Sequence, residues 1–394
     1  MARRPVSATS TFGLLLPLFY LHVVVRMVVG PLLPAIEKDL DITHAAAAGL
    51  LLVGTFGFAG LMLVSSLVTS RITHRVALGI GTAVNAVGTL LIAAAPGLLV
   101  LQVGAFLQGA GAGLYLPSSY ASIVAVAGKA REGRALAMQE TAPALAFLTA
   151  PLIVQALSAL PWRWSFAIPG AVMTVALLML LGSREVGRFR GRAPSFRGVT
   201  LLVWRPLYLL VVVYLIAMAV AANGAYQLLP LYLVSEHGWA AERINVTVAL
   251  SRVTGVGLVL VAGLLIDRLG ARLVIAVASF SVAVMTTALG LLEGQLLSAA
   301  VLLQPLLQQG FWPAALVSVG ALAPPRLRPM LVSLTLPVVA FMGTGVLPAL
   351  WGILADAGLF DLGFIVAGLF LGGVAVLALA LGVGTSRRRR AAAV

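Results

Sequence analysis

The chain has 394 residues, 61% of them hydrophobic and only 10% charged, with a mean hydropathy of +1.08. Soluble domains are about half apolar and a quarter charged, so this composition argues against a water-soluble enzyme. The chain contains no cysteine, which excludes disulfides, thiolate catalysis and cysteine metal sites. The net charge of +14 would also suit a nucleic-acid-binding protein, so the positions of the basic residues must decide.

Apolar runs of about 20 residues, the length that crosses about 30 Å of hydrocarbon, recur along the whole chain. The first run follows Arg3 and Arg4, but it is too long for a signal peptide and lacks a small-residue cleavage site. We therefore predict an all-α integral membrane protein with twelve transmembrane helices. The predicted spans are 13–35, 46–69, 76–95, 98–127, 135–158, 165–182, 208–233, 246–266, 273–292, 297–322, 331–355 and 362–383.

The basic residues follow the positive-inside rule. With the N-terminus in the cytoplasm, only Lys38, Arg163 and Arg243 lie outside, and only Arg26 and Arg252 lie within spans. The other basic residues all fall in cytoplasmic segments, which accounts for the charge of +14 without a nucleic-acid partner. We expect a multi-pass protein of the bacterial inner (plasma) membrane with both termini in the cytoplasm.

The two halves of the chain repeat each other. Leu32-Leu33-Pro34 recurs as Leu228-Leu229-Pro230, Phe166 and Gly170 recur as Phe364 and Gly368, and Gln108-Gly109 matches Gln309-Gly310. The stretch between the halves is polar and rich in arginine. We predict two pseudo-symmetric six-helix bundles, over 1–182 and 207–394, joined by a cytoplasmic linker over 183–206.

A loop motif lies at the inner end of the eighth span. The residues that carry it, Gly263, Asp267, Arg268, Gly270 and Arg272, fit G-x-x-x-D-R-x-G-x-R without a mismatch. With this motif, the twelve spans and the two parallel halves, the chain resembles the major facilitator superfamily. The copy in the first half keeps Arg71 and Arg75 but has lost both glycines and the acid.

The resemblance implies that this loop helps to latch the inner gate, with Asp267 as the acceptor. A solvated salt bridge in the loop is the alternative explanation, worth under about 1 kcal/mol.

Two further family patterns are incomplete. Span 4 has Ala105 where many proton-coupled members carry an arginine, and span 5 has Ala150-Pro151 in place of a glycine-rich signature. Both losses count against a multidrug antiporter.

Three charged residues lie within the spans: Arg26, Arg252 and Glu140. A charge at the bilayer centre costs about 2.5–3.5 kcal/mol, so each needs a partner or a function. From the helical rise, both arginines lie roughly 20 Å from the inner ends of their spans, whereas Glu140 lies only near 9 Å. At least one guanidinium therefore lacks a protein counter-ion at its own depth.

By the resemblance, Arg26 and Arg252 approach the central cavity from opposite halves, and a guanidinium presents paired donors to a carboxylate. The monocarboxylate and oxalate porters are similar in using the eighth span. We therefore expect the two arginines to bind an anion; a structural bridge to helix-end carbonyls is the alternative for each.

Polar and aromatic side chains on spans 4, 7 and 10 complete the expected substrate site, although any of them could serve only in interhelical hydrogen bonds. These residues are Tyr115, Ser119, Asn223, Tyr226, Gln227, Gln304, Gln308 and Trp312. His22, one turn inward of Arg26, and Glu140 are candidates for proton coupling, since both can titrate near neutrality when buried. Packing explains His22 equally well.

These patterns predict a secondary active transporter that moves a small organic anion, a carboxylate by class, by alternating access, with proton coupling as an open extension. No phosphate-binding loop, metal-spaced histidines or Ser-His-Asp set is present, so we expect no enzyme, no metal and no cofactor. The expected partners are the anion and the lipid bilayer, and we expect a monomer. Two alternatives stay open: an efflux transporter for hydrophobic or cationic compounds, and a membrane sensor or scaffold that transports nothing.

Overall fold

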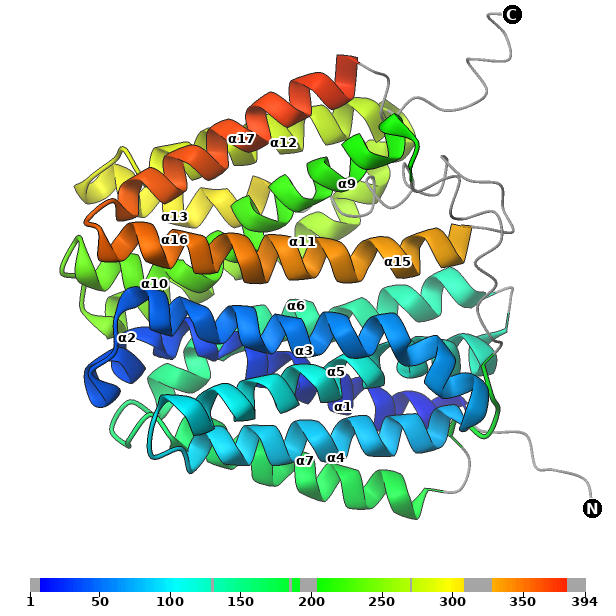
Figure 1. The fold of residues 1–394 in the computed structure, drawn as a ribbon. Helices are drawn as coiled ribbons and strands as arrows, with labels where there is room; N and C mark the ends of the chain where they lie inside the picture. The colour runs from blue at the N-terminus through cyan, green and yellow to red at the C-terminus, as the bar shows by residue number, and fades with distance from the viewer. Residues whose placement is uncertain are drawn as a thin grey trace, which may run out of the picture. The chain divides into compact units, whose positions relative to one another are not determined.

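The computed structural model describes residues 8–128, 131–183, 186–191, 204–269, 271–307 and 328–380 (Figure 1). In these ranges the chain is helical, and its only β-type pairing is an isolated bridge between Thr73 and Arg190. The first half contains α1 (Ala8–Met27), α2 (Val29–Leu40), α3 (His44–Arg71), α4 (His74–Ala93), α5 (Leu98–Ala127), α6 (Glu132–Ala156) and α7 (Trp164–Gly182).

The second half contains two π-helices within its long helices. Its elements are α9 (Pro206–Ala219), η2 (Val220–Gly224), α10 (Ala225–Ser235), α11 (Ala241–Leu269), α12 (Ala271–Leu289), α13 (Gly294–Leu307), α15 (Arg328–Phe341), η3 (Met342–Val346), α16 (Leu347–Asp356) and α17 (Phe360–Ala380).

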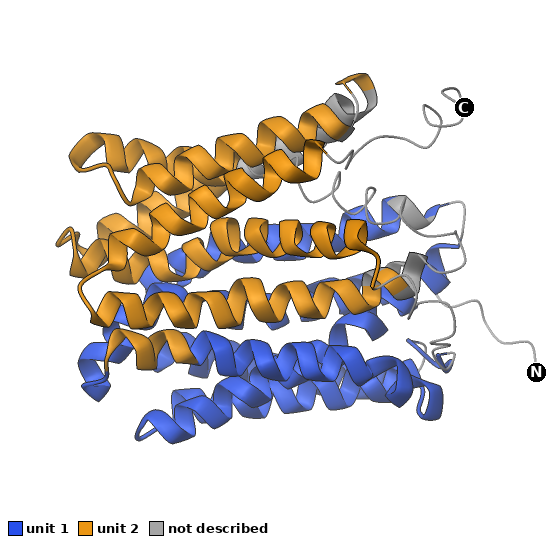
Figure 2. Cartoon of the chain, turned by 45° about the horizontal axis from the view of Figure 1, so that its top comes forward, with its two compact units in different colours: residues 1–42, 50–194 blue, residues 43–49, 195–394 orange. Residues whose placement is uncertain are grey.

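The contacts divide the chain into two compact units (Figure 2). Unit 1 comprises residues 1–42 and 50–194, and unit 2 comprises residues 43–49 and 195–394. The first residues of α3 thus cluster with unit 2, while the rest of that helix belongs to unit 1.

The predicted fold class is correct. Ten described helices are long and apolar enough to cross a membrane. The predicted eighth span corresponds to α11, a helix of 29 residues. Of the predicted tenth span, 297–322, the structure describes the part within α13, and residues 308–322 lie outside the described residues.

Glycines bring the helices of unit 1 into close contact around α5. A Cβ atom on Gly109 would overlap the carbonyl oxygen of Gly54 on α3, and one on Gly88 of α4 would overlap the backbone nitrogen of Gln108. Backbones approach this closely only where no side chain separates them, as at small-residue interfaces between membrane helices. The glycines therefore fix α5 between α3 and α4.

The first span of each unit contains an irregularity at matching positions. In unit 1 the helix breaks at Val28, between α1 and α2. Pro31 explains the break, because its ring nitrogen has no hydrogen to donate to the carbonyl of Met27. In unit 2 the corresponding stretch is the π-helix η2, in which the N–H of Ala225 donates to the carbonyl of Val220.

The second π-helix of unit 2, η3, packs against the first. A Cβ atom on Gly343 would lie 2.5 Å from the Cβ of Ala219, and one on Gly224 would lie 3.0 Å from the carbonyl oxygen of Gly343. Pro348 follows η3 and offers no N–H to the carbonyl of Thr344, which favours a local change of helix type. Unit 2 thus packs two irregular helices together without a spacer side chain.

Candidate functional site

A buried hydrogen-bond network surrounds His22 in unit 1. Asn85 Nδ2 lies 2.7 Å from His22 Nδ1, and His22 Nε2 lies 3.3 Å from Thr82 Oγ1. An amide nitrogen can only donate, so Nδ1 accepts and Nε2 carries the proton that it donates to Thr82. The Thr82 hydroxyl in turn donates to the carbonyl of Leu78 at 2.8 Å. The network therefore fixes one tautomer of the ring.

The network continues through α4 to α5. The hydroxyl of Thr89 lies 3.1 Å from Asn85 Oδ1, and Gln108 Nε2 donates to Thr89 Oγ1 at 3.3 Å. Gln108 Nε2 also donates to the carbonyl of Val25 at 3.2 Å, next to the helix break in the first span. The side chains of Gln108, Thr89, Asn85 and His22 thus form one continuous buried chain of hydrogen bonds.

Arg26 lies beside this network but does not join it through any described bond. Its side chain is half-buried, and its Cζ lies 4.4 Å from the centroid of the Phe58 ring on α3. A cation over an aromatic face is stabilised by the ring quadrupole. The sequence predicts Arg26 as an anion-binding cation, and the structure adds its aromatic partner.

Two predicted substrate residues on α5 serve the framework of unit 1. Tyr115 is fully buried, its ring stacks on His22 with 4.0 Å between centroids, and its hydroxyl donates to the carbonyl of Leu15 at 2.9 Å. Ser119 accepts from Gln139 Nε2 at 3.0 Å. Both residues therefore connect neighbouring helices.

Glu140 lies on α6 and is exposed, and its carboxylate accepts a hydrogen bond from the hydroxyl of Tyr120 on α5. Tyr120 also packs edge-on against Phe19 of α1. No described contact connects Glu140 to His22, so the structure does not bring the two predicted proton carriers into one hydrogen-bond network.

A small pocket in unit 2 contains Arg252. The side chain is 5% exposed, and its Cζ lies 4.3 Å from the centroid of the Tyr226 ring. The pocket is small: its cavity volume of about 10 Å³ has room for about one water molecule. Its lining residues are Ala225, Tyr226, Leu229, Val248, Ser251, Arg252, Leu289, Val301, Gln304 and Pro305. No acidic residue is among these lining residues.

Gln304 lines this pocket and also anchors the π-helix η2. Its Nε2 donates to the carbonyl of Ala221 at 2.7 Å, and the hydroxyl of Thr286 donates to the same carbonyl at 3.3 Å. Thr286 Oγ1 also lies 3.5 Å from Gln304 Nε2. The side-chain amide of Gln304 therefore holds η2 in place, and the same residue lines the pocket with Tyr226 and Arg252.

The remaining predicted substrate residues differ in burial, and two of them lie outside the described residues. Asn223 lies in η2 and is half-buried. Gln227 is buried, and its Oε1 has no hydrogen-bond partner among the described residues. Gln308 and Trp312 lie outside the described residues, as does the predicted repeat Gln309-Gly310. By its hydrogen bonds, Gln304 is the counterpart of Gln108.

The loop motif of unit 2 is described only in part. Gly263 and Asp267 lie in the last third of α11, and the side chain of Asp267 is not described. Gly270 lies outside the described residues. Arg268 is exposed, and Arg272 donates to the carbonyl of Leu379 at 2.8 Å. The latch role of Asp267 stays a prediction. In unit 1, Arg71 is exposed, and Arg75 donates to the carbonyls of Leu181 and Ser183.

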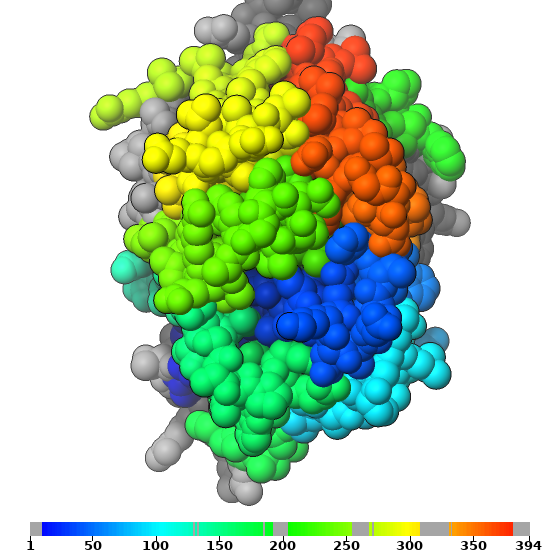
Figure 3. All heavy atoms as spheres, turned by 90° about the vertical axis from the view of Figure 1, so that its left-hand side faces the viewer, coloured from blue at the N-terminus to red at the C-terminus, as the bar shows by residue number. Residues whose placement is uncertain are grey.

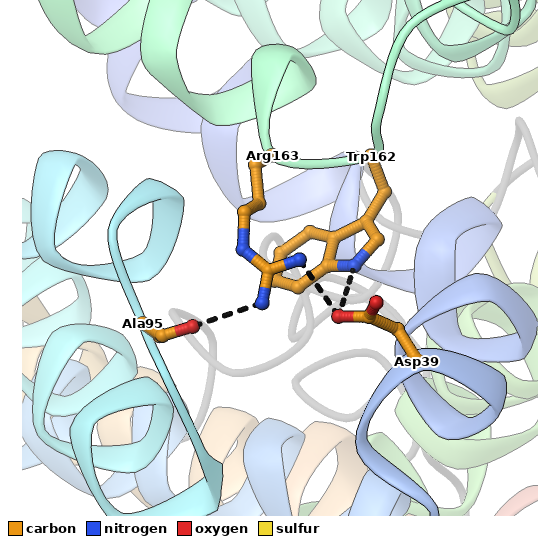
Figure 4. Close-up of polar contacts among 4 residues, drawn as sticks. All are labelled: Asp39, Ala95, Trp162 and Arg163. Atoms are coloured by element: carbon orange, nitrogen blue, oxygen red, sulfur yellow. Dashed lines mark hydrogen bonds and ion pairs between the residues drawn. The ribbon is translucent and has the colours of Figure 1, made fainter.

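A polar cluster joins three segments at one end of unit 1 (Figure 4). Asp39 Oδ2 accepts from Arg163 Nη1 at 2.7 Å and from the indole nitrogen of Trp162 at 3.1 Å. Arg163 Nη2 donates to the carbonyl of Ala95 at 3.0 Å. These hydrogen bonds hold the pKa of the Asp39 carboxyl below its usual value. In the space-filling view of this end, the blue surface of α2 meets the cyan and green surfaces of later segments of unit 1 (Figure 3).

Carboxylates at the end of unit 2 accept from neutral donors. Asp356 accepts from the backbone N–H groups of His44 and Ala45, at 2.8 and 3.2 Å, and so caps the start of α3. Asp361 accepts from the hydroxyl of Tyr232 at 2.5 Å. Asp356 and Asp361 carry out these roles without a cationic side chain in the described contacts.

Thr82, Asn85 and Thr89 order the unit 1 network but were not among the predicted site residues. Their spacing of three and four residues places them on one face of α4, a polar stripe on an otherwise apolar span. That stripe was the available signal. Among the described residues, no group of three or more His, Asp or Glu residues could hold a metal ion.

Comparisons with known proteins agree on the fold. A family model described as Major Facilitator Superfamily matches residues 15–303. No curated protein matches. Among solved structures, an inward-facing, unoccupied bacterial homologue of the human lysosomal transporter Spinster has a TM-score of 0.80 at 14% identity, covering 98% of this chain and 100% of that one.

Two further solved structures show the range of the fold. A POT family transporter in complex with 5-aminolevulinic acid has a TM-score of 0.79 at 12% identity, covering 94% of this chain and 95% of that one. A D-xylose-proton symporter has a TM-score of 0.73 at 16% identity, again covering 94% and 95%. At these identities the likeness concerns the fold alone.

Proposed function

Because the chain belongs to the Major Facilitator Superfamily, we propose that it is a secondary transporter for a small organic anion, a carboxylate by chemical class. Transport by alternating access, multi-pass insertion in a membrane and a small-molecule substrate follow from the family. The class of the substrate is the new element, and it rests on the chemistry of unit 2.

The pocket around Arg252 carries this proposal. A buried guanidinium over the face of Tyr226 provides positive charge and directional donors, and Ser251 and Gln304 add polar groups to the same lining. Among the described lining residues none is acidic, so the charge of the pocket suits an anion rather than a cation. A carboxylate matches the paired N–H groups of arginine in geometry as well as charge.

Arg26 is the second candidate cation, in unit 1. It is half-buried over Phe58 and close in sequence to His22, so it provides charge beside a titratable group. We assign it a role in attracting the anion. This role can be tested separately from that of Arg252.

Proton coupling through His22 forms part of the proposal. His22 accepts from Asn85 at Nδ1, so a proton added there would face an amide that also donates. The bond would break and the Asn85 amide would have to turn, which would disturb the chain of hydrogen bonds that ends at Val25 and the helix break. Protonation would thereby change the first span.

The experiment is uptake of radiolabelled organic anions into proteoliposomes that hold the full chain. Wild-type protein should take up one or more carboxylates. Arg252→Ala should reduce affinity by about 10-fold to 150-fold, the equivalent of a charge-assisted hydrogen bond of about 1.5–3 kcal/mol. Arg252→Lys should also impair uptake, because it keeps the charge and loses the paired geometry.

Arg243→Lys provides the matched control, since Arg243 also lies over an aromatic ring, that of Trp239, but is exposed and outside the pocket. Uptake of cations or apolar compounds in place of anions would instead support an efflux transporter. Absence of any transport, with a folded protein, would support a sensor or scaffold.

We propose the orientation that the basic residues predict, with both termini in the cytoplasm of a bacterium, and a monomeric protein. A reporter fused after Val394 should then be inaccessible to reagents that do not cross the membrane. Labelling of that reporter in intact cells would contradict this orientation.

A further inference from the structure

The first residues of the linker fold back onto unit 1. Backbone N–H groups of His74 and Arg75 donate to the carbonyls of Phe189 and Gly187, at 2.9 and 2.8 Å, and Gly191 donates to the carbonyl of Thr69 at 2.9 Å. Residues 186–191, which we call the strap, therefore pack against the connection between α3 and α4.

The strap has a defined conformation. Gly187 has a φ of +68°, a region in which glycine is favoured, and a Cβ atom on Gly191 would lie 2.7 Å from Thr69 Oγ1. The rings of His74 and Phe189 are 4.7 Å apart. The strap is thus held by both backbone and side-chain contacts.

The strap gathers arginines at one end of unit 1. Arg188 and Arg190 belong to it, and Arg71 ends α3 beside it; all three side chains are exposed. Arg75 has a different role, because its guanidinium donates to the carbonyls at the end of α7. The loop motif has Ser70 where its second copy has Asp267, so the acid that accompanies these arginines in the intact motif is missing here.

Exposed apolar side chains continue from this patch along two neighbouring helices. They include Val76 and Ile80 on α4, and Leu178 and Leu181 on α7. Leu181 lies 3.6 Å from where a Cβ atom on Gly79 would be, which places the ends of α4 and α7 side by side (Figure 1). Both helices are membrane-spanning candidates by length and composition, and the arginines lie at their ends. At the end of a span, a side chain is expected at the level of the lipid headgroups.

We propose that this surface binds an anionic phospholipid. Arg71, Arg188 and Arg190 contact the phosphate-bearing headgroup, and the acyl chains lie along the apolar side chains of α4 and α7. Positive patches of this kind attract anionic lipids, which in cells are enriched in the cytoplasmic leaflet, the side on which the basic residues place the linker.

The test measures the thermal stability and lipid affinity of the full chain in detergent, with added phosphatidylglycerol, phosphatidylcholine or inorganic phosphate. Phosphatidylglycerol should bind the wild-type protein and raise its unfolding temperature, and phosphatidylcholine should do so far less. In a variant with Arg71→Gln, Arg188→Gln and Arg190→Gln, the affinity for phosphatidylglycerol should fall on the order of 100-fold, since each surface cation contributes on the order of fivefold.

A matched variant removes three other exposed cations, through Arg131→Gln, Arg134→Gln and Arg205→Gln. It should keep the wild-type affinity, because it loses the same charge elsewhere. Equal losses in both variants would reduce the effect to net charge and overturn the site. Equal binding of both lipids would contradict a preference for an anionic headgroup. Stabilisation by inorganic phosphate alone at the same concentration would contradict a lipid as the ligand. The single variants Arg188→Gln and Arg190→Gln give smaller, same-direction losses if the triple variant expresses poorly.

Discussion

The two units share one anchoring device and differ in the chemistry around it. In unit 1, Gln108 donates to the carbonyl of Val25 and to Thr89; in unit 2, Gln304 donates to the carbonyl of Ala221 and lies within hydrogen-bond distance of Thr286. The two glutamines are 196 residues apart in the sequence, and so are Val25 and Ala221, whose carbonyls accept the hydrogen bonds. Both anchors hold the first span of their unit at its irregular point.

The residues beside the anchors do not repeat. At the same offset, His22 corresponds to Met218 and Arg26 to Ala222, so the titratable ring and the cation of the first span occur only in unit 1. In the same way, Arg252 corresponds to Phe56. The framework is therefore common to both units, whereas each unit has its own candidate chemistry.

Packing beside the anchors differs as well. Gly109, next to Gln108, allows α5 to approach α3 until their backbones touch. Its counterpart is Pro305, which lines the pocket between α11 and α13 together with Arg252. A close glycine contact fills unit 1 at the position where unit 2 leaves a pocket. This difference supports an anion pocket in unit 2.

The largest effect, on stability, should come from a side chain added at the close contact between Gly109 and Gly54. In Gly109→Leu, the added side chain would overlap the backbone of Gly54, which cannot move aside as a side chain can. We expect a loss of about 3 kcal/mol or more in stability, at or above the upper end of typical overpacking costs. Unfolding temperature and the yield of monodisperse protein in detergent measure it.

Gly60→Leu is the matched control, because no atom lies within 4 Å of its Cβ position on α3. It should stay near wild type. Equal destabilisation by both variants would show that the close contact at Gly109 has no special weight.

The second effect separates the two anchors. Gln108→Met and Gln304→Met keep size but remove the donor, and an unsatisfied buried carbonyl costs about 1–3 kcal/mol. The carbonyl of Ala221 keeps the hydroxyl of Thr286, whereas Gln108 provides the described side-chain bond to Val25. Gln108→Met should therefore lose more stability than Gln304→Met. Gln304→Met, which lies beside the pocket, should lose more substrate affinity than Gln108→Met.

Thermal unfolding and substrate titration on both variants give the comparison. The reverse order, with greater stability loss for Gln304→Met and unchanged affinity, would contradict the distinction between a filled unit 1 and a pocket in unit 2.

The third effect concerns the proton. His22→Gln should abolish the stimulation of uptake by an imposed pH gradient, so that the rate falls to the value without a gradient. Counterflow exchange, which needs no net proton movement, should continue. Met218→Leu, at the corresponding position in unit 2, should leave both rates near wild type, since it conserves volume. A gradient response retained in His22→Gln would limit His22 to packing and hydrogen bonding.

Sequence patterns predicted the fold well because membrane helices leave a strong signal: long apolar runs, a charge bias between the two sides and a repeated plan. Arg252 and Tyr226 were predicted as site residues, and the structure brings both into one pocket. The pairing of Arg26 with Phe58 could not be predicted, since no local spacing relates residues on different spans. For Gln304 the sequence left two roles open, substrate binding and an interhelical hydrogen bond, and the structure shows a hydrogen bond from its Nε2 to the carbonyl of Ala221 in η2.

The smallest effect lies in the outer cluster of unit 1. Hydrogen bonds from Arg163 and Trp162 lower the pKa of Asp39, so the carboxylate contributes stability above its ordinary pKa of about 3.9. That contribution should be lost as the pH falls through the lower value of the folded state. Asp39→Asn should remove this acid-dependent step and leave a small loss at neutral pH, because the ion pair is exposed and screened by salt. Asp361→Asn in unit 2 is the matched variant, since its partner is the neutral Tyr232 hydroxyl. Unfolding temperatures at low and high salt should therefore converge in Asp39→Asn and keep the wild-type difference in Asp361→Asn. An unchanged salt dependence in Asp39→Asn would mean that Asp39 and Arg163 contribute nothing measurable as charges.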